Sequence, residues 1–287
     1  MRVILSAIVL GWMLPLAAWA AVVEGLQMPA WLEHGGQRMA LNVGMTLGSG
    51  DVIHTGTGAR VLLRLEEGSH VKLGEEADLD LATLEPPADE QGVFRGVLKV
   101  LKGAFRFTTS AIGKARARDI EASVAAVTIG IRGTDVWGKA APDRDFVVLI
   151  EGRIDIRRGD EAQQTMGDPL TVFMAPKGAP VLPVTPVNMD DLKVWAQETE
   201  LQEGQGIIGA DGGWIAYLAS YRDHAVAGRA LARLTGAGYA ATLSTAEIGG
   251  QSWSRVGIAG FATRADAEAI AGRLGGEFGF TSPWVGR

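Results

Sequence analysis

The residues that could perform chemistry are few in this chain and lie far apart. Its 287 residues include no cysteine and four histidines, which excludes disulfides, thiolate metal sites and cysteine nucleophiles. His34, His54 and His70 have no partner at the spacing of a metal site or a catalytic triad, so we interpret them as solvated or turn histidines. Glu66 and Glu67 are adjacent, and adjacent residues of a strand point to opposite faces. The sequence therefore predicts no catalytic residue, no metal ligand and no cofactor, and we expect the protein not to be an enzyme.

One arginine needs a separate interpretation. Arg132 lies in the segment IRGT at residues 131–134. A guanidinium group in a turn can bind an anion, or it can donate hydrogen bonds to the carbonyl oxygens of its own loop. We favour the second interpretation and leave the first open.

The first twenty residues have the pattern of an export signal. Arg2 gives a short basic start, residues 3–14 are apolar, and the segment AWA at residues 18–20 places small residues around a cleavage position. An uncleaved anchor is the alternative, but the apolar run is short for a span, which needs about eighteen residues. We therefore expect a signal peptide over residues 1–20, cleavage after Ala20, a periplasmic location, and no stable membrane span after cleavage.

Composition and charge suggest two ordinary domains. Hydrophobic residues make up 47% and charged residues 21%, as in globular proteins, and the length allows two cores. Residues 213–287 contain seven arginines and five acidic residues, a net charge of +2, whereas residues 21–212 have a net charge of −9. A charge of +2 is too weak for a nucleic-acid surface, so we expect no nucleic-acid partner.

The first half of the chain is predicted to be all-β. Short runs of alternating apolar and polar residues, separated by glycine, favour strands at residues 61–65, 71–73, 97–107 and 147–156. We expect a turn at residues 101–103 and another at Glu151-Gly152, where glycine permits positive φ. The pattern predicts a β-domain over residues 21–160, with its core at residues 43–157, folded as a sandwich or a short β-solenoid.

Several motifs in this region resemble the FecR domain family. They are GDVIHTG at residues 50–56, RVLLRLEEGS at residues 60–69, IRGT at residues 131–134, and the turn at Glu151-Gly152. One departure is Val136, where the family usually has an aromatic residue. The resemblance implies an extracytoplasmic module that binds a ligand or contacts an envelope protein, and an extracytoplasmic signalling scaffold is the alternative function. The best-known members carry an anti-sigma segment and a membrane helix ahead of this domain, whereas a signal peptide occupies that place here.

Residues 161–212 are predicted to be a proline- and glycine-rich linker with one short helix. Asn188 can cap that helix, in which Leu192 and Trp195 follow helical spacing. Before the helix, four prolines favour extended backbone: Pro176, Pro180, Pro183 and Pro186. After it, a glycine-rich stretch at residues 204–213 favours flexible backbone.

The last 75 residues are predicted to be an α+β domain with the order βαββαβ. Strands are expected at residues 214–219, 239–247, 252–258 and 280–285. Helices are expected from Asp223 or His224 to Gly236, and from a Thr263 cap to Gly275-Gly276. Such an order predicts a four-stranded antiparallel sheet of the ferredoxin- or RNP-like type over residues 213–287, with both helices on one face. The other face would stay bare and could bind a ligand.

This domain resembles the SPOR (sporulation-related) domain, a peptidoglycan-binding module. The matching segments are YLASY at residues 217–221, GAGY at residues 236–239, SRVGIAGF at residues 254–261 and ADAEA at residues 265–269. Tyr217 stands where glutamine is common, and Ala259-Gly260 replaces Gly-Pro. The resemblance implies binding to peptidoglycan glycan strands that have lost their stem peptides, and a place in the cell envelope and in processes such as cell division.

Strand alternation selects the candidate glycan-binding residues. Ala216 and Leu218 should face the helices and Tyr217 the bare side, and Trp253 and Arg255 should likewise face away from Val256. Aromatic rings can lie against the C–H faces of sugars, while hydroxyl and guanidinium groups bind sugar oxygens. For Trp284, core packing is an equally good interpretation. The predicted set is Tyr217, Ser220, Trp253, Arg255 and Trp284.

Two other functional classes were weighed against glycan binding. An RNA-binding domain shares this topology, but export, weak positive charge and the missing aromatic motif argue against it. A cell-wall hydrolase needs a carboxylate pair or a metal site, and neither is recognisable in the sequence.

Overall fold

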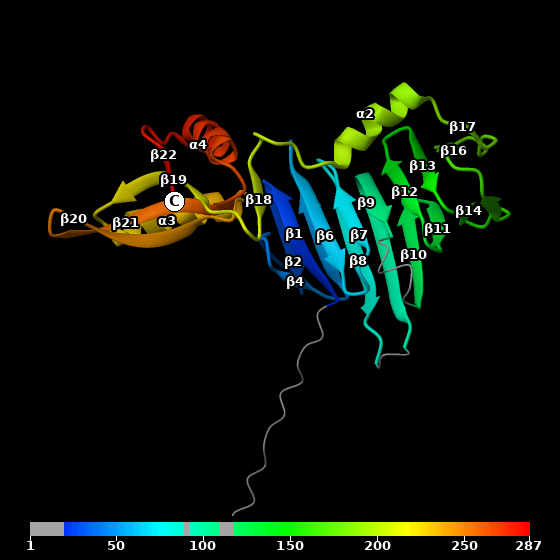
Figure 1. The fold of residues 1–287 in the computed structure, drawn as a ribbon, viewed down its shortest axis with the longest axis horizontal. Helices are drawn as coiled ribbons and strands as arrows, with labels where there is room; N and C mark the ends of the chain where they lie inside the picture. The colour runs from blue at the N-terminus through cyan, green and yellow to red at the C-terminus, as the bar shows by residue number, and fades with distance from the viewer. Residues whose placement is uncertain (1–19, 89–91, 110–116) are drawn as a thin grey trace, which may run out of the picture.

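The computed structural model describes residues 20–88, 92–109 and 117–287. The predicted signal peptide, apart from Ala20, lies outside the described residues. Among these residues, no helix has both the length and the apolar character that crossing a membrane requires. The chain forms a large β-domain and a smaller domain of sheet and two helices, which lie side by side along the longest axis (Figure 1).

The β-domain consists of two sheets packed face to face. In the first sheet the neighbouring strands are β18, β1, β6, β7, β9, β12, β13, β16 and β17, and β4 pairs with the start of β1. In the second sheet they are β3, β2, β5, β8, β9, β10, β11, β14 and β15. The pairings are antiparallel except that of β9 with β10.

The bounds of these elements follow the chain as β1 (Ala21–Gln27), β2 (Ala30–His34), β3 (Gln37–Ala40), β4 (Thr46–Leu47), β5 (Asp51–Thr55), β6 (Arg60–Leu65), β7 (His70–Leu73), β8 (Asp78–Glu85), β9 (Phe94–Thr108), β10 (Arg118–Val124), β11 (Val127–Ile131), β12 (Asp135–Ala140), β13 (Arg144–Glu151), β14 (Ile154–Arg158), β15 (Gln164–Met166), β16 (Thr171–Pro176), β17 (Thr185–Pro186) and β18 (Ile207–Gly209).

Glycines mark places where the chain passes from one sheet to the other. The predicted turn at residues 101–103 is a bend within the single strand β9, which pairs with β8 and β10 before Gly103 and with β7 and β12 after it. Gly103 has a φ of 84°, and a Cβ there would lie 2.5 Å from the Cβ of Ala77. Gly152, with a φ of 92°, separates β13 of the first sheet from β14 of the second. The predicted hairpin at residues 151–152 is therefore a corner between sheets.

Alternating residues of both sheets fill the space between them. Val61, Leu63 and Leu65 of β6 are at most 1% exposed, as are Phe105 and Phe107 of β9. Their neighbours along each strand point to the outer faces. This alternation is the pattern that predicted strands from the sequence, and burying apolar side chains is the main driving force for folding.

Residues 161–212 are not the linker that the sequence predicted. β15 pairs with β14, and β16 pairs with β13 over six residue pairs, so both belong to the β-domain. Pro176 ends β16 and Pro186 lies in β17, the last strand of its sheet, where a missing N–H is tolerated. The predicted helix is present as α2 (Met189–Thr199), and Asn188 Oδ1 accepts a hydrogen bond from Asp190 N at 2.8 Å. The prolines correctly indicated extended backbone in this region. They could not indicate whether that backbone forms hydrogen bonds with a neighbouring strand.

Helix α2 covers part of the outer face of the first sheet (Figure 1). Beneath it lies a second apolar cluster, separate from the main core. The Trp195 ring stacks on that of Trp137, with centroids 5.8 Å apart, and lies 5.0 Å from that of Phe146. The buried members of this cluster come from four strands, from α2 and from the residue two positions before it: Ala104, Trp137, Phe146, Val148, Val172, Val187 and Leu192.

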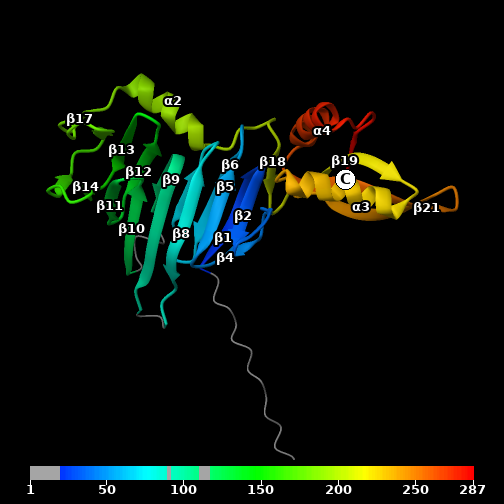
Figure 2. The same ribbon diagram turned by 180° about the vertical axis from the view of Figure 1, so that it is seen from behind.

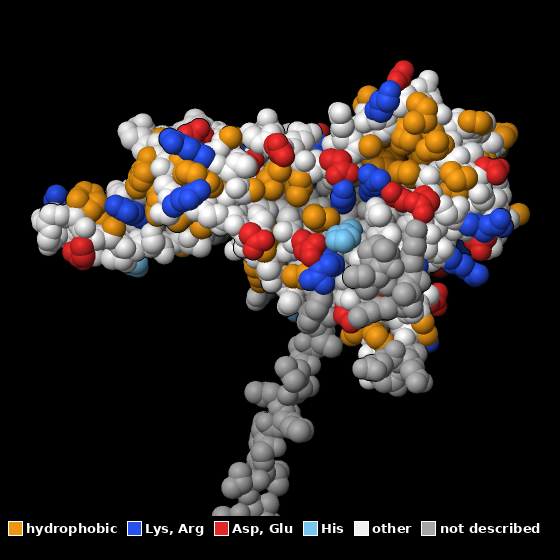
Figure 3. Space-filling view, in the orientation of Figure 1, with side chains coloured by type: hydrophobic (Ala, Val, Ile, Leu, Met, Phe, Trp, Pro, Cys, Tyr) orange, Lys and Arg blue, Asp and Glu red, His pale blue; other side chains and the backbone are white. Residues whose placement is uncertain are grey.

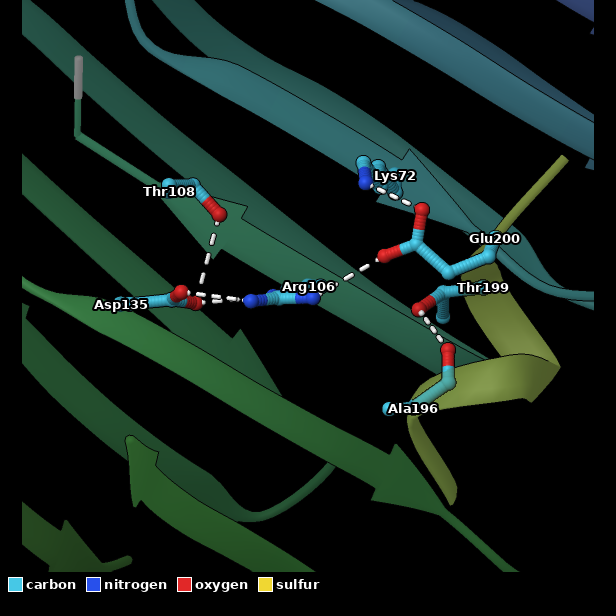
Figure 4. Close-up of polar contacts among 7 residues, drawn as sticks. All are labelled: Lys72, Arg106, Thr108, Asp135, Ala196, Thr199 and Glu200. Carbon is cyan, nitrogen blue, oxygen red and sulfur yellow. Dashed lines mark hydrogen bonds and ion pairs between the residues drawn. The ribbon is translucent and has the colours of Figure 1, made fainter. Parts of the chain in front are cut away.

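Charged residues attach the end of α2 to the same face (Figure 4). Arg106 donates two hydrogen bonds to Asp135, at 2.9 and 2.7 Å, and one to Glu200 at 3.0 Å. Lys72 also donates to Glu200, and Lys139 Nζ lies 2.7 Å from Glu198. The hydrogen bonds from Arg106 to Asp135 raise the pKa of the guanidinium further above its usual value.

The second domain contains β19 (Trp214–Tyr221), α3 (His224–Gly236), β20 (Thr242–Ile248), β21 (Gln251–Phe261), α4 (Arg264–Phe278) and β22 (Trp284–Gly286). The four strands form an antiparallel sheet in the order β20, β21, β19, β22. Thr263 caps α4, as the sequence predicted, and Asp223, one of the two residues expected to start the first helix, caps α3. Helix α4 continues past Gly275-Gly276 to Phe278 and is capped by Gly279, whose φ is 76°, and so the last strand begins later than expected.

The two domains meet in a packed junction. β18 pairs with β1 over three residue pairs, and Ile208 also pairs with Phe261 at the end of β21. The buried carboxylate of Asp266 accepts hydrogen bonds from Gly206 N and Ile207 N, both at 3.0 Å. The first domain is therefore joined to the second by a shared strand and by a buried polar contact.

A second part of the junction lies at the end of α3. Trp31 Nε1 donates to Gly236 O at 3.1 Å, and its ring lies so close to Gly238 that a Cβ there would come within 2.6 Å of it. Arg273 Nη2 donates to Met28 O at 2.9 Å, and Ala30 N donates to Gly238 O at 3.0 Å. No local pattern in the sequence predicts these contacts, because they join residues more than 200 positions apart.

Candidate functional site

The two faces of the second domain's sheet differ in what covers them. Ala216, Leu218, Val256 and Ile258 are at most 1% exposed and face α3 and α4. Figure 2 shows α3 in front of the sheet, so the sheet's open face is turned toward the viewer of Figure 1. The candidate site consists of the side chains on this open face.

Two aromatic rings and one guanidinium group meet at the centre of the open face. Tyr217 on β19 is the direct cross-strand partner of Trp284 on β22, and their rings stack 4.9 Å apart with an angle of 14°. The Cζ of Arg255 on β21 lies 5.5 Å from the centroid of Tyr217 and 5.7 Å from that of Trp284. Both distances are within the range of cation–π attraction. Trp284 is 37% exposed, so it is not part of the core.

Arg255 has aromatic neighbours and no acidic partner among the described residues. Its Nε is buried, and its N–H donates no hydrogen bond within that part of the chain. A guanidinium group has five N–H donors, and burying one without a partner is costly. A group held in this way is available to bind an oxygen-rich ligand.

A β-bulge brings Ser220 onto the same face. Strict alternation from Tyr217 would turn Ser220 toward the helices. The register shifts between Tyr217 and Ala219, so that Ala219 pairs with Val256 and Ser220 pairs with Arg255. Cross-strand partners share a face of the sheet, which places Ser220 beside Arg255.

Trp253 lies two residues before Arg255, on the same face. The Cζ of Arg222 is 5.0 Å from the centroid of its ring, and Trp253 Nε1 is buried without a hydrogen-bond partner in the described chain. Ser254, between them, faces the helices and contacts His224 Nδ1 at 3.0 Å. The structure therefore brings together Tyr217, Ser220, Arg255 and Trp284, and it places Trp253 next to them with an additional arginine, Arg222.

The acidic residues of this domain lie away from the open face. Asp223 caps α3, Glu268 pairs with Arg264 on α4, and Glu277 accepts from Tyr239. Glu247 is the cross-strand partner of Ser252, the residue before Trp253. Because successive residues of a strand point to opposite faces, Ser252 and Glu247 lie on the helix side of the sheet. Burial acts to raise the pKa of Asp266, but hydrogen bonds from Thr263, Ile207 and Gly206 outweigh it and hold that pKa below its usual value. The open face is thus more basic than the domain's net charge of +2 suggests.

Strand alternation did not select Arg222 as a candidate binding residue, because Arg222 lies beyond the end of the strand, where alternation no longer applies. It follows Tyr221, the last residue of β19, and is exposed. Gly257 was missed as well. It is the cross-strand partner of Tyr217, and a Cβ there would lie 3.3 Å from the tyrosine ring, so the glycine leaves room for that ring on the sheet.

The histidines of the first domain have partners that the sequence did not reveal. His54 Nδ1 lies 2.6 Å from Asp78 and its Nε2 lies 3.4 Å from Glu33, because His54 and Asp78 are direct partners between β5 and β8. His34 lies 2.5 Å from Asp51. His70 Nε2 lies 3.3 Å from Glu24. All three histidines thus have acidic partners that spacing along the sequence could not reveal, although the side chain of His34 is 69% exposed and so is solvated, as predicted. Within the described residues no three such side chains converge as they would around a metal ion.

Arg132 does not make the predicted bonds to loop carbonyls within the described chain. It is exposed and lines a polar pocket of about 540 Å³ on the outer face of the second sheet. Gly130 of β11 also lines this pocket. Its cross-strand partners, Glu121 on β10 and Asp155 on β14, line the pocket on either side of it.

The fold and site define a two-domain protein, in which a β-sandwich is joined to an antiparallel sheet with one open face of arginine and aromatic residues. Residues 51–155 match the family model described as FecR protein, and residues 210–285 match the model described as SPOR domain. The chain thus contains a FecR domain and a C-terminal SPOR domain, as its motifs predicted.

Comparison with solved structures gives a weaker likeness. Two crystal structures of a candidate anti-sigma factor from Parabacteroides distasonis ATCC 8503 superpose with a TM-score of 0.42 and 13% sequence identity. The superposition covers 51% of this chain and 64% of that protein. No curated protein matches the sequence.

Proposed function

We propose that this protein works in the periplasm without enzymatic activity and binds peptidoglycan glycan strands on the open face of its SPOR domain. The observation that carries the proposal is Arg255, which lies against the stacked rings of Tyr217 and Trp284 and has no acidic partner among the described residues. The match to the SPOR domain supports the same ligand.

The chemistry of the face suits a sugar polymer. Aromatic rings offer flat apolar surfaces to the C–H faces of pyranose rings. Ser220 and the N–H groups of Arg222 and Arg255 can bind hydroxyl and carbonyl oxygens. A glycan strand without stem peptides also exposes lactyl carboxylates, and a charge-assisted bond from an otherwise unpaired arginine is stronger than a neutral one. The preference for peptide-free glycan is therefore assigned to Arg255.

The FecR domain is assigned a second binding role, toward a ligand or an envelope protein. The observation that favours it is the polar pocket at Arg132, which is separate from the junction and from the glycan face. A regulatory scaffold, in which this domain contacts a protein partner while the SPOR domain holds the cell wall, is the second candidate function, and the FecR match supports it.

Export is part of the proposal and has its own test. β1 begins at Ala21, the residue that follows the expected cleavage position. Mass spectrometry of the protein from the producing cell should find Ala21 at the N-terminus. Recovery of the chain with Met1 in the cytoplasm would contradict a periplasmic location.

The test of glycan binding is a pull-down of the full chain with purified sacculi. Arg255→Ala should weaken binding by about tenfold or more, because a hydrogen bond to a charged group contributes about 1.5–3 kcal/mol. Arg229→Ala is the matched control, since Arg229 is an exposed arginine of α3, on the covered side of the sheet. Equal losses in the two variants would show that only net charge matters, and the proposed site would be wrong. Release of soluble muropeptides by the wild-type protein would contradict the absence of enzymatic activity.

A further inference from the structure

A small pocket lies between helix α2 and the outer face of the first sheet. Its volume is about 220 Å³, and its lining combines apolar and charged side chains. Pockets for drug-sized ligands are larger, about 300–1,000 Å³, so this one suits a single ring. The lining residues are Lys139, Ala141, Asp143, Arg144, Phe146, Met174 and Trp195.

Aromatic side chains give this pocket a firm floor. Trp195 is half-buried and makes ring contacts with Phe146 and with the fully buried Trp137. Because Trp137 stacks on the inner side of Trp195, the indole is held in one orientation. The part of Trp195 that remains accessible belongs to the pocket.

Charged groups form the rim. Arg144 is exposed, and its guanidinium group pairs with the neighbouring Asp143 at 3.0 Å. Lys139 is held by Glu198. The pocket thus has an aromatic surface on one side and both donors and acceptors at its edge. This is the same combination of groups as on the SPOR face, where Arg255 lies beside two aromatic rings.

The pocket and the SPOR face are presented on the same side of the molecule. Figure 3 shows hydrophobic side chains gathered over α2, and hydrophobic and basic side chains mixed over the lobe of β19–β22, on one face. The shared strand β18 and the contacts of Trp31 and Asp266 fix the two domains relative to each other. Two sites joined rigidly can engage one extended ligand together, and the second binding event then costs less than a separate one.

We propose that the pocket at Trp195 is a second sugar-binding site, which takes one pyranose ring of the same cell wall that the SPOR domain binds. The proposal rests on the proposed function of the SPOR face. The ring stacks on Trp195 and Phe146, and its hydroxyl or acyl oxygens accept hydrogen bonds from Arg144 and Lys139. Its effect is to increase the avidity of the full chain for peptidoglycan.

The experiment compares variants of the full chain in the sacculus pull-down. Trp195→Ala should weaken binding about fivefold, as expected for the loss of one aromatic contact. Val194→Ala is the matched control, because Val194 is the preceding residue of α2 and is 64% exposed. Arg144→Ala removes an exposed rim group whose guanidinium pairs only with an exposed carboxylate in the described chain, so it should weaken binding about twofold to threefold with little change in melting temperature.

The outcomes separate this proposal from the function of the SPOR face. If Arg255→Ala abolishes binding while Trp195→Ala and Arg144→Ala both bind as the wild type does, the SPOR face is correct and the second site is wrong. If Arg255→Ala binds normally, the proposed function itself fails. If Trp195→Ala weakens binding only together with a loss of α2 structure in circular dichroism, and Arg144→Ala has no effect, the pocket serves folding and the proposal is overturned.

Discussion

Arg106 of the first domain and Arg255 of the second both project from a β-strand, but their guanidinium groups have different neighbours. Arg106 donates to Asp135 and Glu200, and those contacts attach α2 to the sheet. Arg255 lies between aromatic rings and has no acidic partner in the described chain. The comparison teaches that an arginine with its charge satisfied internally stabilises the fold, whereas one with an unsatisfied charge on an accessible face is a candidate for binding.

The largest effect is expected on the covered side of the strand that carries Arg255. Val256 is fully buried against the helices, and an aspartate there would bury a charge without a partner. Val256→Asp should therefore unfold the SPOR domain, as measured by circular dichroism and thermal melting. Val256→Ala, which only leaves a cavity, should lower the melting temperature without unfolding the domain at room temperature. A folded Val256→Asp variant would mean that the two faces are reversed.

Breaking the charge network of Arg106 should destabilise the β-domain without affecting glycan binding. Arg106→Met leaves the largely buried carboxylate of Asp135 without its cation, at a cost of about 2 kcal/mol in the free energy of unfolding. Chemical denaturation measures this loss. The double variant Arg106→Met/Asp135→Asn should recover part of it. If Arg106→Met reduced sacculus binding as strongly as Arg255→Ala, the distinction between the two arginines would not hold.

Truncating an aromatic ring on the open face should affect binding more than folding. Trp253→Ala removes a ring that faces away from the helices, so binding to sacculi should fall about tenfold, or 1–2 kcal/mol, with little change in melting temperature. Arg222→Ala tests the neighbouring cation and should give a smaller loss. A collapse of the melting transition in Trp253→Ala, with binding retained at low temperature, would assign Trp253 to the core.

The smallest effect is expected from Asp266, a charge whose partners are backbone N–H groups at the junction. Its pKa lies below the usual value in the folded chain. Ionised Asp266 therefore stabilises the folded state at pH values above the ordinary pKa of a carboxyl group. This stabilisation is lost as the pH falls through the lower pKa that Asp266 has in the folded chain. Wild-type stability should decline in this acid range more steeply than that of Asp266→Asn, in denaturation curves at matched pH. Parallel curves for the two proteins would remove Asp266 from the junction's energetics.

Local signals in the sequence were sufficient for much of the fold. Asn188 and Thr263 were identifiable as helix caps because an N-cap bonds to N–H groups two or three residues away. Alternation along β6 and β21 likewise identified the buried sides, because it depends only on strand geometry. The faces of Tyr217 and Arg255 followed from the same rule.

The remaining features depend on which strands become neighbours. Arg106 and Asp135 are 29 positions apart, and His54 and Asp78 are 24 positions apart, so no local spacing connects them. Ser220 reached the open face through a bulge, which breaks the alternation that the prediction used. Residues 161–212 contain proline in two strands near a sheet edge, and proline content alone favours a linker. Trp31 gave no hint of its contact with Gly236 before the tertiary structure was known.

The strand β18 has a mechanical consequence. Because it pairs with β1 of the sandwich and also with the end of β21, a pull on a ligand bound to the open face would pass into the first domain through backbone hydrogen bonds as well as along the covalent chain. A flexible linker would first extend and only then transmit tension. The connection through β18 is already held by hydrogen bonds to both domains, so it can extend little before it transmits tension. A partner held by the FecR domain would therefore experience displacement of the cell wall almost directly, which would make the molecule a stiff coupling between wall and partner.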